Sequence, residues 1–306
     1  MSAHMPVIEV LDTRLLRAWP LPMPSADGDK EDRGHVMIIG GSREMPGAVI
    51  LAATAALRAG AGKLTVATGQ SVAQLVASAL PESRVIGLPE TEGGGIPPYC
   101  VESFRSLTKR KVDAILIGPG MQDEASISTF VRALLPIFPD AKIVLDACAM
   151  GVVRGSQAYQ EDAENTGPTR LILTPHAGEM ARLLGDDKED IRADPYTAAR
   201  DAARNWNAVV ALKGAVTCIA SPDGQLWQHD DGNIGLASSG SGDVLAGVIA
   251  GLAARGASVE QATAWGVMLH ARAGRQLAER IGPLGFLARE IADEIPAALR
   301  WFETAE

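Results

Sequence analysis

From His35 onward, short runs of β-branched residues alternate with longer helical segments, and this alternation constrains the fold most. Residues 36–39 predict a buried strand, which a Gly-Gly-Ser turn ends. The alanine-rich segment 46–60 predicts a helix, and residues 64–67 predict the next strand. This βαβ unit and its repetition are typical of an α/β protein with a mostly parallel sheet and helices on both faces.

The pattern continues to the C-terminus. Further strands are predicted at residues 84–88, 114–117, 143–145, 171–173, 208–212, 217–220 and 225–228. A Pro-Asp-Gly turn predicts a hairpin between the last two. Beyond Asp243 the chain is predicted to be helical, at residues 244–254, 259–279 and 286–302.

Composition narrows the class of protein. Apolar residues make up 47% and charged residues 21%, as in ordinary globular chains. The formal net charge of −9, with no basic block, argues against a nucleic-acid partner. The three cysteines are too widely spaced to indicate a zinc site or a disulfide framework. We find no signal peptide and no membrane span, so a cytoplasmic protein is expected.

The most informative motif is the run of small residues from Gly235 to Gly247, which contains Ser239-Gly240-Ser241-Gly242-Asp243. Glycines just before a helix leave several backbone N–H groups free to bind an anion. Asp243 would then act as a base beside that anion. The alternative is that Asp243 only caps the helix, because Asp is a favoured N-cap residue.

Four other segments lie at predicted strand ends, where open α/β sheets bind ligands. Two are turns, Gly40-Gly41-Ser42 and Gly118-Pro119-Gly120. The third runs from Thr174, a candidate N-cap, through His176 to Glu179. The fourth is Lys213-Gly214, between two strands. Each also has an ordinary structural interpretation: a tight turn, a surface histidine or a plain hairpin.

Taken in order, these segments resemble the ADP- or ATP-dependent NAD(P)H-hydrate dehydratases of the ribokinase-like superfamily. The resemblance spans about residues 35–300 and includes Gly47-Ala48 and the run from Arg58 to Gly62. It implies a three-layer αβα sandwich with a mostly parallel central sheet. We expect one such domain at residues 34–302, preceded by an N-terminal extension at residues 1–33 that is too short to hold the epimerase domain of bifunctional relatives.

The resemblance also implies site residues. Ala48, Gly120, His176 and Asp243 would contact hydrated NADH or NADPH. The adenine nucleotide, ADP or ATP, would contact Lys213, Gly214, Ala215, Val216, Thr217, Gly240, Ser241 and Gly242. Asp243 would assist removal of the proton from the hydrate hydroxyl during its phosphorylation, and phosphate would then be eliminated. Such reactions need Mg²⁺, for which Glu179 is the candidate ligand.

The chain departs from the family pattern after its central strand. Asp146-Ala147-Cys148-Ala149-Met150-Gly151 stands where the family usually has Asp-Ala-Asp-Ala-Leu-Asn, so Cys148 and Gly151 replace an acid and an amide. These changes bear on the substrate more than on the fold.

The leading hypothesis is therefore an ADP-dependent lyase that repairs hydrated NADH and NADPH. The resemblance further implies a homo-oligomer, a tetramer in many relatives, and a separate epimerase in the same repair pathway. Two alternatives stay open: a small-molecule kinase acting on a hydroxymethylpyrimidine or hydroxyethylthiazole alcohol, and a catalytically silent nucleotide-binding protein. The choice between ADP and ATP is not visible in the sequence.

Overall fold

The computed structural model describes residues 7–25, 27–109, 111–154 and 169–304. Its strands are β1 (Ile8–Val10), β2 (His35–Ile39), β3 (Lys63–Gly69), β4 (Arg84–Leu88), β5 (Ala114–Ile117), β6 (Lys142–Leu145), β7 (Leu171–Leu173), β8 (Ala208–Leu212), β9 (Thr217–Ala220) and β10 (Leu226–His229). They form one sheet in the order β1-β10-β9-β8-β7-β6-β5-β2-β3-β4. Only β9 runs against the others, since all other neighbouring pairs are parallel.

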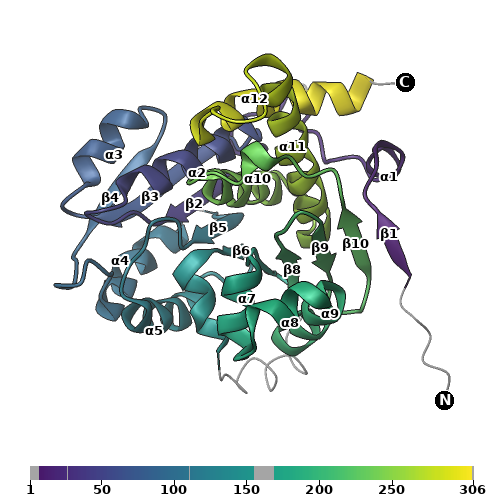
Figure 1. Ribbon diagram of the computed structural model, residues 1–306. Helices are drawn as coiled ribbons and strands as arrows, with labels where there is room; N and C mark the ends of the chain where they lie inside the picture. Colours follow the sequence, from purple (N-terminus) through teal and green to yellow (C-terminus); the bar gives the residue numbers. More distant parts are fainter. Residues whose placement is uncertain (1–6, 26, 110, 155–168, 305–306) are drawn as a thin grey trace.

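The α-helices are α1 (Thr13–Ala18), α2 (Pro46–Arg58), α3 (Ala73–Ala79), α4 (Glu102–Arg105), α5 (Glu124–Leu134), α7 (Ala177–Leu184), α8 (Lys188–Ala193), α9 (Pro195–Trp206), α10 (Ser241–Ala254), α11 (Val259–Arg280) and α12 (Ala288–Thr304). Short 3₁₀ helices are η1 (Pro98–Val101), η2 (Ser106–Lys109), η3 (Leu135–Ile137), η4 (Ala147–Val153) and η5 (Ile234–Leu236). Figure 1 shows α2, α10, α11 and α12 on one face of the sheet, and α4, α5, α7, α8 and α9 on the other.

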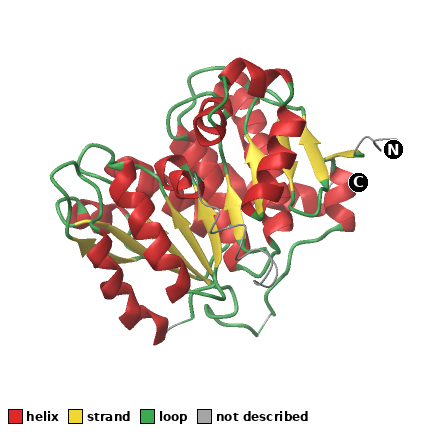
Figure 2. Cartoon of the chain, turned by 90° about the horizontal axis from the view of Figure 1, so that it is seen from below, coloured by secondary structure: helices red, strands yellow, loops and turns green. Residues whose placement is uncertain are grey.

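The predicted α/β class and the mostly parallel sheet are confirmed, as Figure 2 also shows from below. Each predicted strand is present, and its ends lie within two residues of the predicted ones. The predicted Pro-Asp-Gly turn joins β9 to β10. Strand β1 was not predicted; it adds a parallel strand beside β10 at the edge of the sheet. The polar composition of residues 154–168 predicts a loop, and this segment lies, apart from Arg154, outside the described residues.

Strand β2 shows how the three layers form. All five of its residues are buried, because helices cover both faces of the sheet. Val36 and Ile38 belong to the core on the α2 and α10 side, whereas Met37 and Ile39 belong to the core on the α5 and α9 side. This alternation follows from the two-residue repeat of a strand, and it produces two separate hydrophobic cores.

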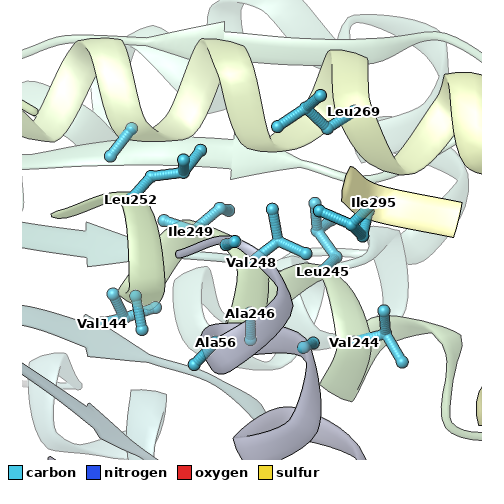
Figure 3. Close-up of a cluster of buried hydrophobic side chains, with 14 of the residues drawn as sticks. Ala56, Val144, Val244, Leu245, Ala246, Val248, Ile249, Leu252, Leu269 and Ile295 are labelled. Carbon is cyan, nitrogen blue, oxygen red and sulfur yellow. The ribbon is translucent and has the colours of Figure 1, made fainter. Parts of the chain in front are cut away.

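Helix α10 is the central helix of the first layer. Its apolar side chains pack between the sheet, α2, α11 and α12, and Figure 3 shows Val248 and Ile249 among them. Gly247 and Gly251 let α2 approach closely, since a Cβ on either would lie within 2.4 Å of a carbonyl oxygen of Ala52 or Ala56. Every α10 residue except Gly242 and Asp243 is buried, so the helix is fixed in place and presents only its first turn.

The order of the strands indicates where a ligand would bind. The chain runs from β2 outward to β3 and β4, and then returns to β5 on the other side of β2. In parallel α/β sheets, ligands bind at the carboxyl ends of the strands near such a reversal. No helix among the residues that the structure describes is long and apolar enough to cross a membrane.

Candidate active site

Polar groups that follow three neighbouring strands meet at the carboxyl edge of the sheet. Asp146 directly follows β6, Thr174 follows β7 and Lys213 follows β8. The pairing of β7 with β8 continues past both strands through a parallel bridge between His176 and Lys213, whose N–H donates to the carbonyl oxygen of Pro175 over 2.8 Å. Residues predicted from separate motifs are therefore brought together by strand register.

Lys213 is the centre of a charged cluster. Its Nζ lies 3.4 Å from Oδ1 of Asp146 and 3.9 Å from Oε2 of Glu179. Burial alone would lower the pKa of Lys213, but the carboxylates of Asp146 and Glu179, together with Asp243, outweigh that effect and raise it. The ammonium group thus stays charged and partly neutralises three carboxylates.

Asp243 lies in the first turn of α10, as predicted, but it is not the N-cap. Gly240 is the N-cap residue, with φ of 88° and no side-chain cap, so the capping interpretation is wrong. Burial raises the pKa of Asp243 to about 7, repulsion from Asp146 and more weakly Glu179 adds to this, and Lys213 opposes it. A carboxylate with such a pKa can accept a proton and return it near neutral pH.

Asp146 is a site residue that was not among those predicted from the sequence. Its side chain is buried, and Oδ1 accepts a hydrogen bond of 2.7 Å from the hydroxyl of Thr174. The prediction that Thr174 caps the next helix is wrong, because its hydroxyl is directed to Asp146 and His176 is the N-cap of α7. An acid directly after a buried central strand was the signal available in the sequence.

His176 and Glu179 form a capping box at the start of α7. Nδ1 of His176 accepts hydrogen bonds from the N–H groups of Gly178 and Glu179, at 3.0 and 3.1 Å. In return Oε2 of Glu179 accepts from the N–H of His176 at 2.8 Å. Because Nδ1 is an acceptor here, the neutral ring carries its proton on Nε2. The side chain is 58% exposed, and Nε2 lies 3.6 Å from Oε2 of Glu179, too far for a hydrogen bond, so this N–H can reach a ligand.

Gly120 and Ala48 form a second part of the site. A Cβ on Gly120 would lie 2.9 Å from Cβ of Ala48 and 2.4 Å from the carbonyl oxygen of Met45, so the turn after β5 touches the start of α2. Gly120 also has φ of +67°, which favours glycine. One helical turn beyond Ala48, Cδ1 of Leu51 would lie 2.6 Å from a Cβ on Gly240, so α2 also approaches the start of α10 closely.

The predicted nucleotide segment, residues 213–217, is a turn between antiparallel strands β8 and β9. Gly214 and Ala215 are exposed, and Thr217 begins β9. A Cβ on Gly242 would lie 3.4 Å from Nζ of Lys213, so this turn reaches the start of α10. The exposed backbone of this turn and the ammonium group of Lys213 thus lie next to the N-terminus of α10.

These features can be compared with known proteins. A family model described as NAD(P)H-hydrate dehydratase matches residues 36–297. The chain belongs to the NAD(P)H-hydrate dehydratase family. The family resemblance stated from the motifs is therefore confirmed.

Individual members support the assignment along the whole chain. The chain is 47% identical to the ADP-dependent (S)-NAD(P)H-hydrate dehydratase of Xanthomonas campestris pv. campestris, over 96% of this chain and 97% of that protein. The ADP/ATP-dependent NAD(P)H-hydrate dehydratase of Bacillus subtilis, co-crystallised with ATP and Mg²⁺, has a TM-score of 0.80 and 29% identity over 96% of this chain and 99% of that chain. A ribokinase-like superfamily protein of Enterococcus faecalis has a TM-score of 0.80 and 25% identity over 99% of both chains, and the predicted ribokinase-like fold is confirmed.

Glu179, the candidate Mg²⁺ ligand, belongs to the charged cluster around Lys213. Within the described residues, no three Asp, Glu, His or Cys side chains are placed to hold a metal ion together. The carboxylates of Asp146 and Glu179 instead share the ammonium group of Lys213, which also attracts Asp243 electrostatically. This donor set fits Mg²⁺ that arrives with phosphate oxygens and water and takes one or two carboxylates from the protein.

The stretch that departs from the family pattern forms η4. Sγ of Cys148 donates to the carbonyl oxygen of Met121 over 3.2 Å, and burial raises the pKa of this thiol to about 12. A Cβ on Gly151 would lie 2.7 Å from Oε1 of Glu124. Both residues line a small hollow with Glu179 and Arg182, so the two replacements lie in the wall beside the charged cluster.

Proposed function

We propose that the protein is an ADP-dependent (S)-NAD(P)H-hydrate dehydratase. ADP phosphorylates the hydroxyl of hydrated NADH or NADPH and leaves as AMP, and elimination of phosphate restores NADH or NADPH. Family membership and the name of the Xanthomonas relative support this proposal. The observation that carries it is the carboxylate of Asp243, held with a pKa of about 7 at the first turn of α10 beside Lys213.

The nucleotide phosphates would bind at the start of α10. Gly240, Ser241 and Gly242 would bind the phosphates there, with little side chain to block an anion. The backbone N–H groups of the two glycines would do so directly, because the N–H of Ser241 donates to the carbonyl oxygen of Ser238 over 3.3 Å. The turn from Lys213 to Thr217 would contact the rest of the nucleotide, and Nζ of Lys213 would lie next to the phosphates. These groups would stabilise negative charge on the phosphoryl group during transfer.

The hydrate would bind between the start of α2 and the start of α7. Ala48 and Gly120 offer a close, bare surface to the substrate. His176 would donate its Nε2 proton to a substrate oxygen, since Nδ1 is occupied by the capping box. Asp243 would accept the hydroxyl proton as the oxygen attacks the phosphoryl group, and its pKa near neutrality suits proton acceptance at cellular pH.

Mg²⁺ would be held by the phosphates, with Glu179 as its candidate protein ligand. When bound, the ion neutralises phosphate charge. The position of Glu179 in the charged cluster, with Oε2 3.9 Å from Nζ of Lys213, supports this assignment.

The same proposal includes the domain bounds, the cellular location, the oligomeric state and a partner enzyme. The catalytic domain would comprise residues 34–302, with residues 1–33 as an extension. The protein would act in the cytoplasm as a homo-tetramer. The S in the name of the Xanthomonas relative denotes one stereoisomer, so a separate epimerase would supply that form from the other. Light scattering coupled to size exclusion would give a mass about four times that of the 32.0 kDa chain.

The test is direct. Purified protein is mixed with ADP, Mg²⁺ and hydrated NADH, and absorbance at about 340 nm is followed, the band of the reduced nicotinamide. The proposal expects recovery of absorbance with one AMP and one phosphate released for each NADH. Absence of both recovery and phosphate release would refute it. Transfer of phosphate to a stable alcohol product would favour a small-molecule kinase instead.

A further inference from the structure

The glycine-rich start of α10 has one side chain to hold it. Gly240 and Gly242 flank Ser241, and neither glycine can be fixed by side-chain contacts. Glycine loses more conformational freedom on ordering than any other residue, so a Gly-Ser-Gly turn needs an external constraint to keep its N–H groups aligned. The buried side chain of Ser241 is the place for such a constraint.

His270 supplies contacts at that place. It lies on α11, and its Nε2 is 3.0 Å from Oγ of Ser241 and 3.1 Å from the carbonyl oxygen of the same residue. A carbonyl oxygen can only accept, so both contacts are favourable when Nε2 carries the proton. One imidazole N–H then holds both the main chain and the side chain of Ser241.

The charge state of the imidazole agrees with this arrangement. Burial lowers the pKa of His270 to about 4, with the hydrogen bond to Ser241 opposing that effect and Lys213 adding to it. The ring is therefore neutral at cellular pH. A neutral imidazole can hold the helix start by hydrogen bonds alone, without adding a second positive charge near Lys213.

We propose that His270 is a positioning residue that fixes the first turn of α10, and through it both the phosphate-binding N–H groups and Asp243. The inference rests on the proposed function, because it assigns His270 a role in the same nucleotide site. His270 lies 29 residues beyond Ser241 and does not belong to the glycine-rich motif.

The test measures ADP binding by calorimetry in the full-length protein, without the hydrate. His270→Ala is expected to weaken ADP binding about ten-fold, which corresponds to losing one or two ordinary hydrogen bonds. His270→Gln places an amide N–H in reach of Ser241 and should restore affinity to within about three-fold of wild type. If His270→Ala fails to fold, His270→Asn, whose amide is too short to reach, replaces it in the comparison.

Two further readouts separate positioning from a general structural role. Hydrogen exchange should rise in the peptide covering residues 238–246 and stay unchanged in β2 and β5. The double variant of His270→Ala with Ser241→Ala should bind ADP no more weakly than His270→Ala alone, because Ser241 contributes through His270. The control is His35→Gln, which removes a buried histidine hydrogen-bonded to Thr65 at the opposite end of the sheet and should leave ADP affinity unchanged.

Wild-type ADP affinity in His270→Ala, exchange that rises throughout the chain, or multiplicative effects in the double variant would each overturn this inference. Failure of the wild-type protein to bind ADP would instead refute the proposed function. The two failures are therefore distinguishable.

Discussion

Asp243 combines two properties that a surface carboxylate lacks. It lies in the first turn of a buried helix, and its pKa is raised from 3.8 to about 7 by burial, with repulsion from Asp146 as a further cause. A group that must be ionised to accept a proton loses activity as pH falls through its pKa. The raised pKa of Asp243 therefore predicts how both the reaction rate and the stability of the fold depend on pH.

The first prediction concerns the pH dependence of the rate. The value of kcat/KM should rise with pH and level off, with an apparent pKa near 7 from Asp243. Asp146→Asn removes a repulsive charge, so the rising limb should move to lower pH. The control is Asp113→Asn, which changes a carboxylate at the amino end of β5, hydrogen-bonded to the N–H of His35. A limb that stays in place in Asp146→Asn would contradict the assigned cause.

The second prediction concerns stability. The pKa of Asp243 is higher in the folded chain than in the unfolded chain, so the folded state loses stability as pH rises from about 4 to about 7. Asp243→Asn removes this penalty. The variant should be more stable than wild type by about 1 to 3 kcal/mol at about pH 8, and by less at about pH 5. Chemical denaturation at both pH values measures this, and a variant less stable than wild type at the higher pH would contradict it.

At the scale of elements, the strands β2 to β10 were predictable, including the edge strand β4, and the edge strand β1 was not. The strands from β2 to β8 are apolar runs, and their composition is sufficient to predict them. Strand β1 has three exposed residues, and it exists because Ile8 pairs with Leu226, more than two hundred residues away. No local pattern encodes such a partner.

The segment around β1 and α1 yields a third prediction. Leu16 of α1 is fully buried in the core shared with α10 and α11, and Trp19 stacks on Trp227 of β10. Leu16→Ala should destabilise the protein by about 2 to 4 kcal/mol, because it leaves a cavity in a packed core. Leu15→Ala, at the partly buried neighbour, is the matched control and should cost less. Equal and small losses in urea unfolding would show that α1 does not pack as described.

At the scale of the whole molecule, the fold assembles a site from segments that are far apart. The motif order predicted Gly120, His176, Lys213 and Asp243 as site residues, and the sheet brings His176 and Lys213 side by side. The sequence could not reveal that Lys213 contacts Asp146, 67 residues earlier, or that His270 contacts Ser241. Those contacts depend on strand order and helix packing, which no single motif contains.

The fourth prediction belongs to the whole molecule and concerns ADP binding. A ligand that binds only the folded protein raises its melting temperature, and saturating ADP at about one hundred times Kd adds about 2.7 kcal/mol. Because the phosphates would contact backbone N–H groups of α10, Asp243→Asn should show nearly the same thermal shift with ADP as the wild-type protein. A shift lost in this variant would mean that Asp243 binds the nucleotide.

The central claim is that Asp243 performs proton transfer at a site whose nucleotide is held by other groups. The most direct measurement is single-turnover conversion of hydrated NADH by Asp243→Asn at saturating ADP and Mg²⁺. The account predicts a rate at least about a thousand-fold below wild type, at the upper range for loss of a general base, with ADP affinity within about two-fold. A wild-type rate in that variant would contradict the account.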